Sequence, residues 1–151
     1  MNDKLDVSTA EWEVLRVVWS LDHATSRNVG DVLKETQDWE LATTKTLLGR
    51  LVKKGYLKTE KDGNKFIYEA TINESDGMHS RIVELGDSFC AQSRGEAITS
   101  MIGSFALTLE DKQKILEALD KKEYSDSLSC SCISNCMCEA GSCKCGHHHI
   151  N

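Results

Sequence analysis

The sequence lacks the segments that would send a chain to or through a membrane. Its opening residues, MNDKLDVSTAEWEV, are polar and partly acidic, without the basic start and apolar core of a secretory signal. No apolar run approaches the roughly 18 residues that a membrane-spanning helix needs. We therefore expect a cytoplasmic protein with no membrane partner.

Cysteine is nearly absent before residue 130. Cys90 is the exception, and beside Phe89 on an expected helix it is interpreted as a small buried hydrophobe outside any site. Six of the seven cysteines lie between Cys130 and Cys145. Because cytoplasmic thiols stay reduced, this cluster favours a metal site over disulfides.

Positive charge is scarce overall, since the net charge is −6, but it is unevenly distributed. Residues 41–68 carry seven bases and two acids, whereas residues 71–151 carry seven bases and twelve acids. A local basic surface can still attract a polyanion, because fields are screened beyond about 8 Å. Charge alone leaves nucleic-acid contact and a solvated lysine-rich face equally open.

Three helices are predicted in the first 55 residues. Ser8 and Glu11 form a capping box before the first helix, and a second helix begins after Thr25 or Ser26. A third runs through ATTKTLLGRLVKKG and ends near Gly55. Its buried side is formed by Leu47, Leu48, Leu51 and Val52, and its other side presents Thr43, Thr44, Lys45, Thr46, Arg50, Lys53 and Lys54.

A hairpin follows in YLKTEKDGNKFIYEA, where Asp62-Gly63 marks the turn and lysines lie at and beside the tip. Three helices and a basic hairpin predict a winged helix-turn-helix whose third helix enters the major groove. Threonine hydroxyls and methyls can contact bases, while lysine and arginine contact phosphates. A polar helix face alone would indicate only solvent exposure, but with the hairpin the DNA interpretation is favoured.

The stretches AEWEVLRVVWSLDHATSRNV, TTKTLLGRLVKKGYL and KDGNKFIY, with Trp39 between the first two, resemble the CopY/BlaI/MecI family of winged-helix repressors. The resemblance covers about the first 120 residues and implies a homodimer on double-stranded, inverted-repeat operator DNA. This sequence departs from the family pattern at Ala42, a position where some relatives carry lysine. The matching DNA-binding positions are Thr43, Thr46 and Arg50 on the helix and Lys61, Asn64 and Lys65 in the wing, to which geometry adds Thr44 and Lys45.

The segment from Glu74 to about Lys122 is predicted to form helices with apolar stripes. One such stripe contains Met78, Ile82, Leu85 and Phe89. These stripes exceed what a seventy-residue domain can cover, so a partner helix is expected. The resemblance implies that the partner is a second copy of the chain. It also implies that the proteolytic switch of the beta-lactam-responsive branch, an Asn-Phe pair, is replaced here by Ser104-Phe105.

The last segment arranges its cysteines in three C-x-C pairs. In an extended chain residues i and i+2 point to one side, so each pair can hold a metal with two thiolates. Gly141 lets two pairs meet, and four thiolates suit tetrahedral Zn(II) or the softer Cu(I). The candidate ligands are Cys136, Cys138, Cys143 and Cys145, with Cys130 and Cys132 as an additional pair.

The run from Cys136 to Cys145 has the form CxCxxxxCxC, which resembles the copper-responsive branch of the family. That resemblance implies that the Zn(II)-bound form holds the operator and that Cu(I) replaces Zn(II) and releases it. A copper chaperone is a candidate metal donor. His147, His148 and His149 are interpreted as a polar terminus rather than as ligands.

The sequence therefore predicts a mainly α protein with a small β hairpin. Its expected parts are a winged helix-turn-helix DNA-binding domain (1–72), a helical dimerisation region (73–124) and a flexible Cys-rich metal-binding tail (125–151). The expected function is a copper-responsive repressor. The alternative is a cytoplasmic Cu(I)/Zn(II) buffer or chaperone with a metallothionein-like tail. An enzyme is not expected. A catalytic zinc keeps one coordination position open and has a general base nearby, whereas here the thiolates exceed the four that one zinc takes.

Overall fold

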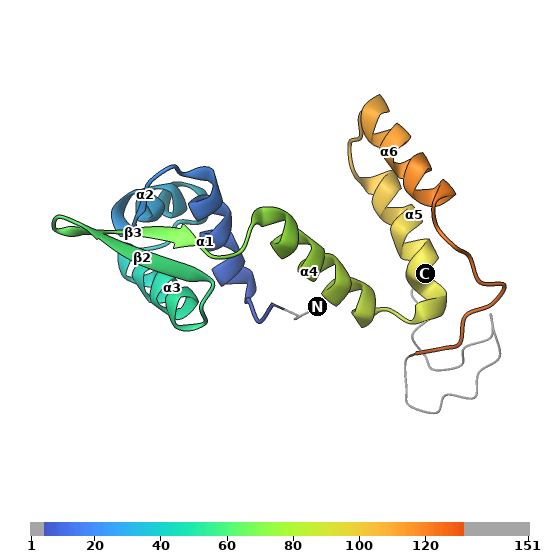
Figure 1. Ribbon diagram of the computed structural model, residues 1–151, viewed down its shortest axis with the longest axis horizontal. Helices are drawn as coiled ribbons and strands as arrows, with labels where there is room; N and C mark the ends of the chain where they lie inside the picture. The colour runs from blue at the N-terminus through green and yellow to red at the C-terminus, as the bar shows by residue number, and fades with distance from the viewer. Residues whose placement is uncertain (1–4, 132–151) are drawn as a thin grey trace. The chain divides into compact units, whose positions relative to one another are not determined.

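The computed structural model describes residues 5–131, and the chain divides after Ile82 into two compact units (Figure 1). The first unit holds three helices and a small sheet, as the sequence predicts. The second holds the remaining helices. Within the described residues, no helix has both the length and the hydropathy needed to cross a bilayer.

Helix α1 (Thr9–Ser20) begins with the predicted capping box. The Ser8 amide donates to Glu11 Oε2 over 2.8 Å, and the Glu11 amide donates to Ser8 Oγ over 3.2 Å. These two bonds satisfy backbone groups that an α-helix leaves open at its start. Val14 and Leu15 of this helix are fully buried.

Helices α2 (Ser26–Gln37) and α3 (Leu41–Lys53) form the helix-turn-helix. Thr25 caps α2, in agreement with the prediction, and α2 ends at Asp38 in a left-handed conformation with φ of 56°. Gly30 of α2 packs closely against the Leu41 side chain at the start of α3, since an added Cβ would stand 2.6 Å from Leu41 Cδ1. Gly55, with φ of 82°, lets the chain turn out of α3.

The sheet has three antiparallel strands in the order β1-β3-β2: β1 (Ala24–Thr25), β2 (Leu57–Asp62) and β3 (Lys65–Ala70). The sequence predicted the β2–β3 hairpin but not β1. Because Asp62 pairs with Lys65, the two-residue loop is Gly63-Asn64, one position later than the predicted turn. Gly63 has φ of 59°, which glycine adopts without steric cost.

The core of the first unit lies between the three helices and the inner side of the sheet. Its buried side chains are Val7, Val14, Leu15, Val17, Val18, Ala24, Val29, Leu33, Leu47, Leu48, Leu51 and Leu57. Helices α1, α2 and α3 all contribute side chains to this core, and the packing fixes which side of α3 faces inward.

Helix α4 (Glu74–Ser88) contains the boundary between the two units, whereas the sequence placed a boundary after residue 72. The beginning of α4 belongs to the first unit because it packs on α1. A Cβ at Gly77 would lie 2.9 Å from the Trp19 ring, and Arg81 lies over the Trp12 ring at 5.0 Å. Ser80 Oγ also accepts from the Leu5 amide over 2.9 Å.

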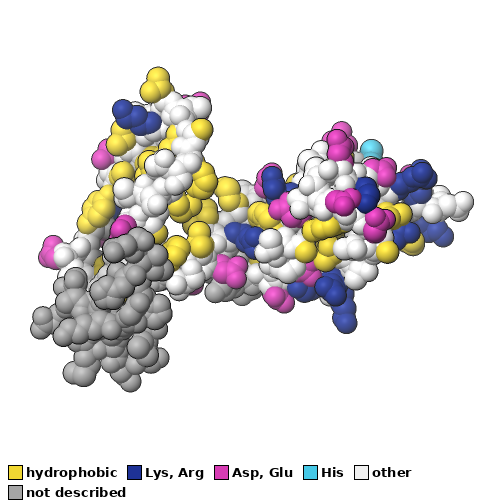
Figure 2. All heavy atoms as spheres, turned by 180° about the vertical axis from the view of Figure 1, so that it is seen from behind, with side chains coloured by type: hydrophobic (Ala, Val, Ile, Leu, Met, Phe, Trp, Pro, Cys, Tyr) yellow, Lys and Arg dark blue, Asp and Glu magenta, His cyan; other side chains and the backbone are white. Residues whose placement is uncertain are grey.

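The second unit consists of the end of α4, a short 3-10 helix η1 (Ala91–Ser93), α5 (Arg94–Ser104) and α6 (Leu109–Asp120). Thr108 and Asp111 form a capping box at the start of α6. Many apolar side chains of α5 and α6 face outward, and Figure 2 shows them as yellow spheres over these helices. Ile98 is 57% exposed and Phe105 62%, so these stripes are largely uncovered by the residues that the structure describes.

Candidate nucleic-acid interface

The outer side of α3 carries the polar and basic side chains that the sequence predicted for DNA. Thr43, Lys45, Thr46 and Arg50 are all exposed, while Leu47, Leu48 and Leu51 face the core. Thr46 Oγ1 donates to the Ala42 carbonyl over 3.0 Å, so its oxygen keeps lone pairs that point away from the helix. The helix therefore presents one continuous face suited to a major groove.

The structure corrects one predicted contact. Thr44 is fully buried, and its side chain therefore faces the core rather than any ligand. Its position explains this, because residues 44, 47, 48 and 51 follow the i, i+3, i+4, i+7 spacing of a single helix face. Among the described residues, no group forms a hydrogen bond with Thr44 Oγ1.

The hairpin places the predicted wing residues at and beside its tip. Lys61, Asn64 and Lys65 are exposed, and the Asp62–Lys65 pair closes the loop between them. In Figure 1 the hairpin projects beside α3, and in Figure 2 dark blue Lys and Arg side chains gather at this end of the unit. A wing in this place can contact phosphates flanking a helix in the groove.

Ion pairs inside the protein divide the seven bases of residues 41–68 into two groups. Lys54 lies 2.9 Å from Glu11 Oε2, and Lys58 lies 3.0 Å from Glu69 Oε2. Within residues 5–131 the other bases form no ion pair: Lys45, Arg50, Lys53, Lys61 and Lys65. The bases available to a polyanion thus include every cation predicted for the DNA site.

The Lys54–Glu11 pair fixes α3 against the start of α1. Burial by itself raises the pKa of Glu11, but the hydrogen bonds from Lys54 and Ser8 outweigh burial and hold that pKa below its ordinary value of 4.5. The hydrogen bond to Glu11 in turn raises the pKa of Lys54. Both groups are therefore charged at neutral pH.

The turn between α2 and α3 is held by Lys34. Its Nζ lies 2.7 Å from Asp38 Oδ1 and 2.7 Å from Glu40 Oε1, one carboxylate at the end of α2 and one at the cap of α3. The hydrogen bond to Asp38 is the main cause of a raised pKa at Lys34 and a lowered pKa at Asp38. All three side chains are exposed, so this network orients the turn more than it stabilises the fold.

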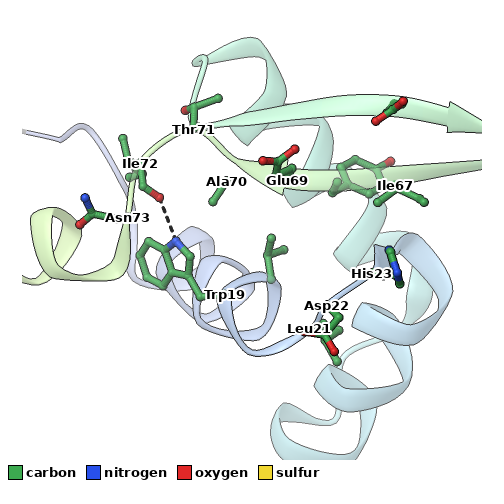
Figure 3. Close-up of a pocket in the computed structure, with 13 residues that line it drawn as sticks. Trp19, Leu21, Asp22, His23, Ile67, Glu69, Ala70, Thr71, Ile72 and Asn73 are labelled. Atoms are coloured by element: carbon green, nitrogen blue, oxygen red, sulfur yellow. Dashed lines mark hydrogen bonds between the residues drawn. The ribbon is translucent and has the colours of Figure 1, made fainter.

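A hollow of about 680 Å³ lies between the end of α1 and β3 (Figure 3). At one end the Trp19 indole N–H donates to the Ile72 carbonyl over 3.0 Å, shown as the dashed line. Its lining includes three carboxylates, Asp22, Glu60 and Glu69. Those charges repel phosphate, so the hollow is not part of a nucleic-acid surface.

The predicted metal ligands lie mostly beyond the described residues. Cys132, Cys136, Cys138, Cys143 and Cys145 fall outside them, as do His147–His149. Cys130 is described and half-buried, and its sulfur lies 3.5 Å from the sulfur of Cys90, a residue that the sequence assigned to the core. Cys90 is indeed buried, at 7% exposure.

Three helices, a hairpin and a basic outer side on α3 define a winged-helix DNA-binding protein. A model of the penicillinase repressor family matches residues 7–121. The 16.5 kDa protein in the ptsI 3′ region of Latilactobacillus sakei is 39% identical over 89% of this chain and 94% of its own length. The chain therefore belongs to the penicillinase repressor family, which confirms the predicted resemblance to CopY/BlaI/MecI winged-helix repressors.

Two further comparisons each cover half of this chain. The methicillin resistance regulatory protein MecI of Mammaliicoccus sciuri is 36% identical over 50% of this chain and 61% of that protein. The solution structure of monomeric Bacillus licheniformis BlaI in complex with the blaP half-operator is 38% identical. It matches 50% of this chain and 93% of that one, with a TM-score of 0.45.

Proposed function

We propose that the chain is a copper-responsive transcriptional repressor. In this proposal a Zn(II)-loaded homodimer binds an inverted-repeat operator, and Cu(I) binding at the thiolates of the tail releases it. The genes under its control would serve copper homeostasis. The proposal needs no copper chaperone as a metal donor.

The observation that carries the repressor function is the basic outer side of α3 together with the wing. Lys45 and Arg50 on α3 and Lys61 and Lys65 in the hairpin are exposed and form no ion pair within the described residues. Phosphates would replace the counterions of these four side chains, which gives affinity without sequence preference. Thr43 and Thr46 are exposed on the same helix as Lys45 and Arg50 and would supply the hydroxyls and methyls for base contacts.

The exposed apolar stripes support a homodimer. Ile82 of α4 is 54% exposed, Ile98 of α5 57% and Leu116 of α6 44%, each on a helix that also buries little within its own unit. Exposed apolar surface on this scale marks an association site. A two-fold dimer would place two α3 helices on the two half-sites of an inverted repeat.

The donor chemistry of the tail supports a thiophilic metal. Four thiolates from Cys136, Cys138, Cys143 and Cys145 would satisfy Zn(II), which takes four sulfur ligands at about 2.3 Å in structural sites. Cu(I) prefers the same soft ligands in a different number and geometry. Exchange of one ion for the other would therefore change the free energy of the tail's conformations, which a switch requires.

The test uses the full chain and a duplex selected from a random library by the Zn(II)-loaded protein. Fluorescence anisotropy then measures its affinity while Cu(I) is added anaerobically. We expect Kd to rise at least tenfold, which corresponds to about 1.4 kcal/mol. Replacing Cys143 and Cys145 by serine should leave operator binding intact while blunting the copper effect.

Other outcomes assign different functions. Unchanged affinity across the titration would remove copper sensing and leave a repressor with another signal. Absence of any selected duplex, with Cu(I) still bound, would favour the metal-buffer alternative. Loss of operator binding in the Cys143→Ser, Cys145→Ser variant would make zinc a structural requirement rather than a signal.

A further inference from the structure

Two cysteines that are far apart in the sequence meet just after α4 ends. Cys90 Sγ and Cys130 Sγ lie 3.5 Å apart, and both residues are thiols. Cys90 is 7% exposed and lies between α4 and η1, whereas Cys130 is half-buried. Both belong to the second unit, so the contact brings the first cysteine of the C-x-C series against the helical part of that unit.

Hydrogen bonds hold the same two segments together. The Ala91 amide donates to Ser131 Oγ over 2.9 Å, and the Gln92 side-chain amide donates to the Leu128 carbonyl over 3.0 Å. These bonds lie on either side of the sulfur contact along the chain. The two thiols are therefore held close to each other by the residues around them.

The pair is not a complete metal site by itself. Cys90 and Cys130 both take part in further interactions, and a structural zinc site needs four ligands. Among residues 5–131, no group of three or more Cys, His, Asp or Glu side chains is arranged to hold a metal. A zinc site that includes both thiols must therefore take its remaining ligands from beyond residue 131, where the sequence has five more cysteines.

The distance between the two sulfurs agrees with tetrahedral coordination. With each Zn–S bond at about 2.3 Å, two thiolates on one tetrahedral ion stand about 3.8 Å apart. The observed 3.5 Å differs from this by a few tenths of an ångström, so zinc needs only a small shift to fit. A linear ion with bonds of the same length would need the sulfurs about 4.6 Å apart and fits less well.

We propose that Cys90 and Cys130 are two of the four thiolate ligands of Zn(II) in the zinc-loaded chain. The other two ligands come from cysteines that follow Cys130, so the pair would replace two members of the CxCxxxxCxC set in this form. Each thiol releases its proton to solvent as its bond to zinc forms. The inference rests on the proposed function, from which it takes Zn(II) as the bound ion.

A ligand at Cys90 would tie the metal to the helical unit. Helix α4 ends at Ser88, so zinc at Cys90 would fix residues 128–131 to the α4–η1 junction. Cu(I) prefers thiolates in a different number and geometry. Its entry would rearrange the thiolates and loosen this tie, which gives the two loaded states the difference in free energy that a switch requires.

The test uses the unmutated full-length chain, reduced and loaded with 113Cd(II), which takes the same thiolate ligands as Zn(II) and is detected by NMR. Correlation of the 113Cd nucleus with cysteine β-protons identifies each ligand directly. We expect the β-protons of Cys90 and Cys130 to couple to one and the same 113Cd nucleus. Coupling to cysteines of the tail but not to Cys90 would overturn the inference and leave the proposed function standing.

Two variants measure what the ligand contributes. Cys90→Ser should weaken Zn(II) binding by about tenfold or more in competition with a chromophoric chelator, because changes even beyond the direct ligands of a metal cost that much. Ser131→Ala is the matched control, since it removes the acceptor of the Ala91 amide but no sulfur. It should leave the 113Cd couplings and the Zn(II) affinity unchanged.

The helical circular dichroism of both variants should match that of the unmutated chain, and the NMR result needs no variant at all. Undiminished Zn(II) affinity in Cys90→Ser would count against the ligand. An operator complex that persists under Cu(I), in a chain whose Cys90 couples to 113Cd, would instead remove the copper-sensing function and keep Cys90 as a zinc ligand.

Discussion

Replacing Thr44 with valine tests how the structure divides the threonines of α3. Thr44 is fully buried, and its hydroxyl forms no hydrogen bond with any described residue. Valine has nearly the same shape, keeps the β-branch and removes the hydroxyl. The change therefore exchanges an unsatisfied polar group for a methyl in an apolar setting, with little effect on helix propensity.

The expected gain follows from the cost of burying an unsatisfied hydroxyl, which is about 1–3 kcal/mol in proteins. Allowing for imperfect packing of the new methyl, we expect stabilisation of about 1–2 kcal/mol. In a unit of this size each kcal/mol shifts Tm by about 4–8 °C. Tm should therefore rise by about 4–16 °C, and operator affinity should stay within about twofold because the side chain does not reach the outer face.

Tryptophan fluorescence is the natural probe, because Trp12, Trp19 and Trp39 all lie in the first unit. Thr46→Val is the matched control. Thr46 is exposed, so its replacement should give no gain in Tm but should weaken operator binding. If Thr44→Val lowered Tm, or weakened DNA binding as much as Thr46→Val, the burial of Thr44 would be refuted.

Two further predictions concern charge. Glu11→Gln should destabilise the first unit by about 1–2 kcal/mol at pH 7, because the Glu11 carboxylate accepts a hydrogen bond from the charged Lys54 ammonium group. Since its folded pKa is lowered, that contribution is present above pH 4.5 and is lost as the pH falls through the folded value, so chemical denaturation from pH 7 to 3 should show the difference shrinking. A constant difference would contradict the assignment. Replacing Lys61 and Lys65 with alanine should weaken all duplexes alike and flatten the salt dependence of log K by about 1.8 per chain, whereas Lys114→Ala should not. A loss confined to one operator sequence would argue against phosphate contacts.

Local signals in the sequence were sufficient to predict most helices and the hairpin of the first unit. The capping box at Ser8 and Glu11 predicted the start of α1 correctly, because a cap depends on residues only three positions apart. The start of α2 after Thr25 was also predicted. The apolar spacing of α3 likewise predicted its buried side. Thr44 lies on the same apolar spacing, and this position on the helix explains its burial although threonine is polar.

Features that depend on distant contacts were not predictable in this way. Strand β1 has two residues, Ala24 and Thr25, too few to show alternation, and it exists because it pairs with β3. The meeting of Cys90 with Cys130 spans 40 positions and leaves no periodic signal. Gly77 was also missed, since its need for space becomes visible only when the rings of α1 are in place.

In the proposed function, helix α4 is the element through which a metal signal would reach the DNA-binding unit. It is one uninterrupted helix of 15 residues, about 22 Å long. Its beginning packs on Trp12 and Trp19, and the Cys90–Cys130 contact follows directly after its end. Its exposed apolar stripe is also part of the surface that the proposed dimer would cover. A change in what holds residues 128–131 to this junction would therefore act on a helix shared by the winged unit and the proposed dimer contact. In that dimer, the half-site spacing of the two α3 helices would depend on both.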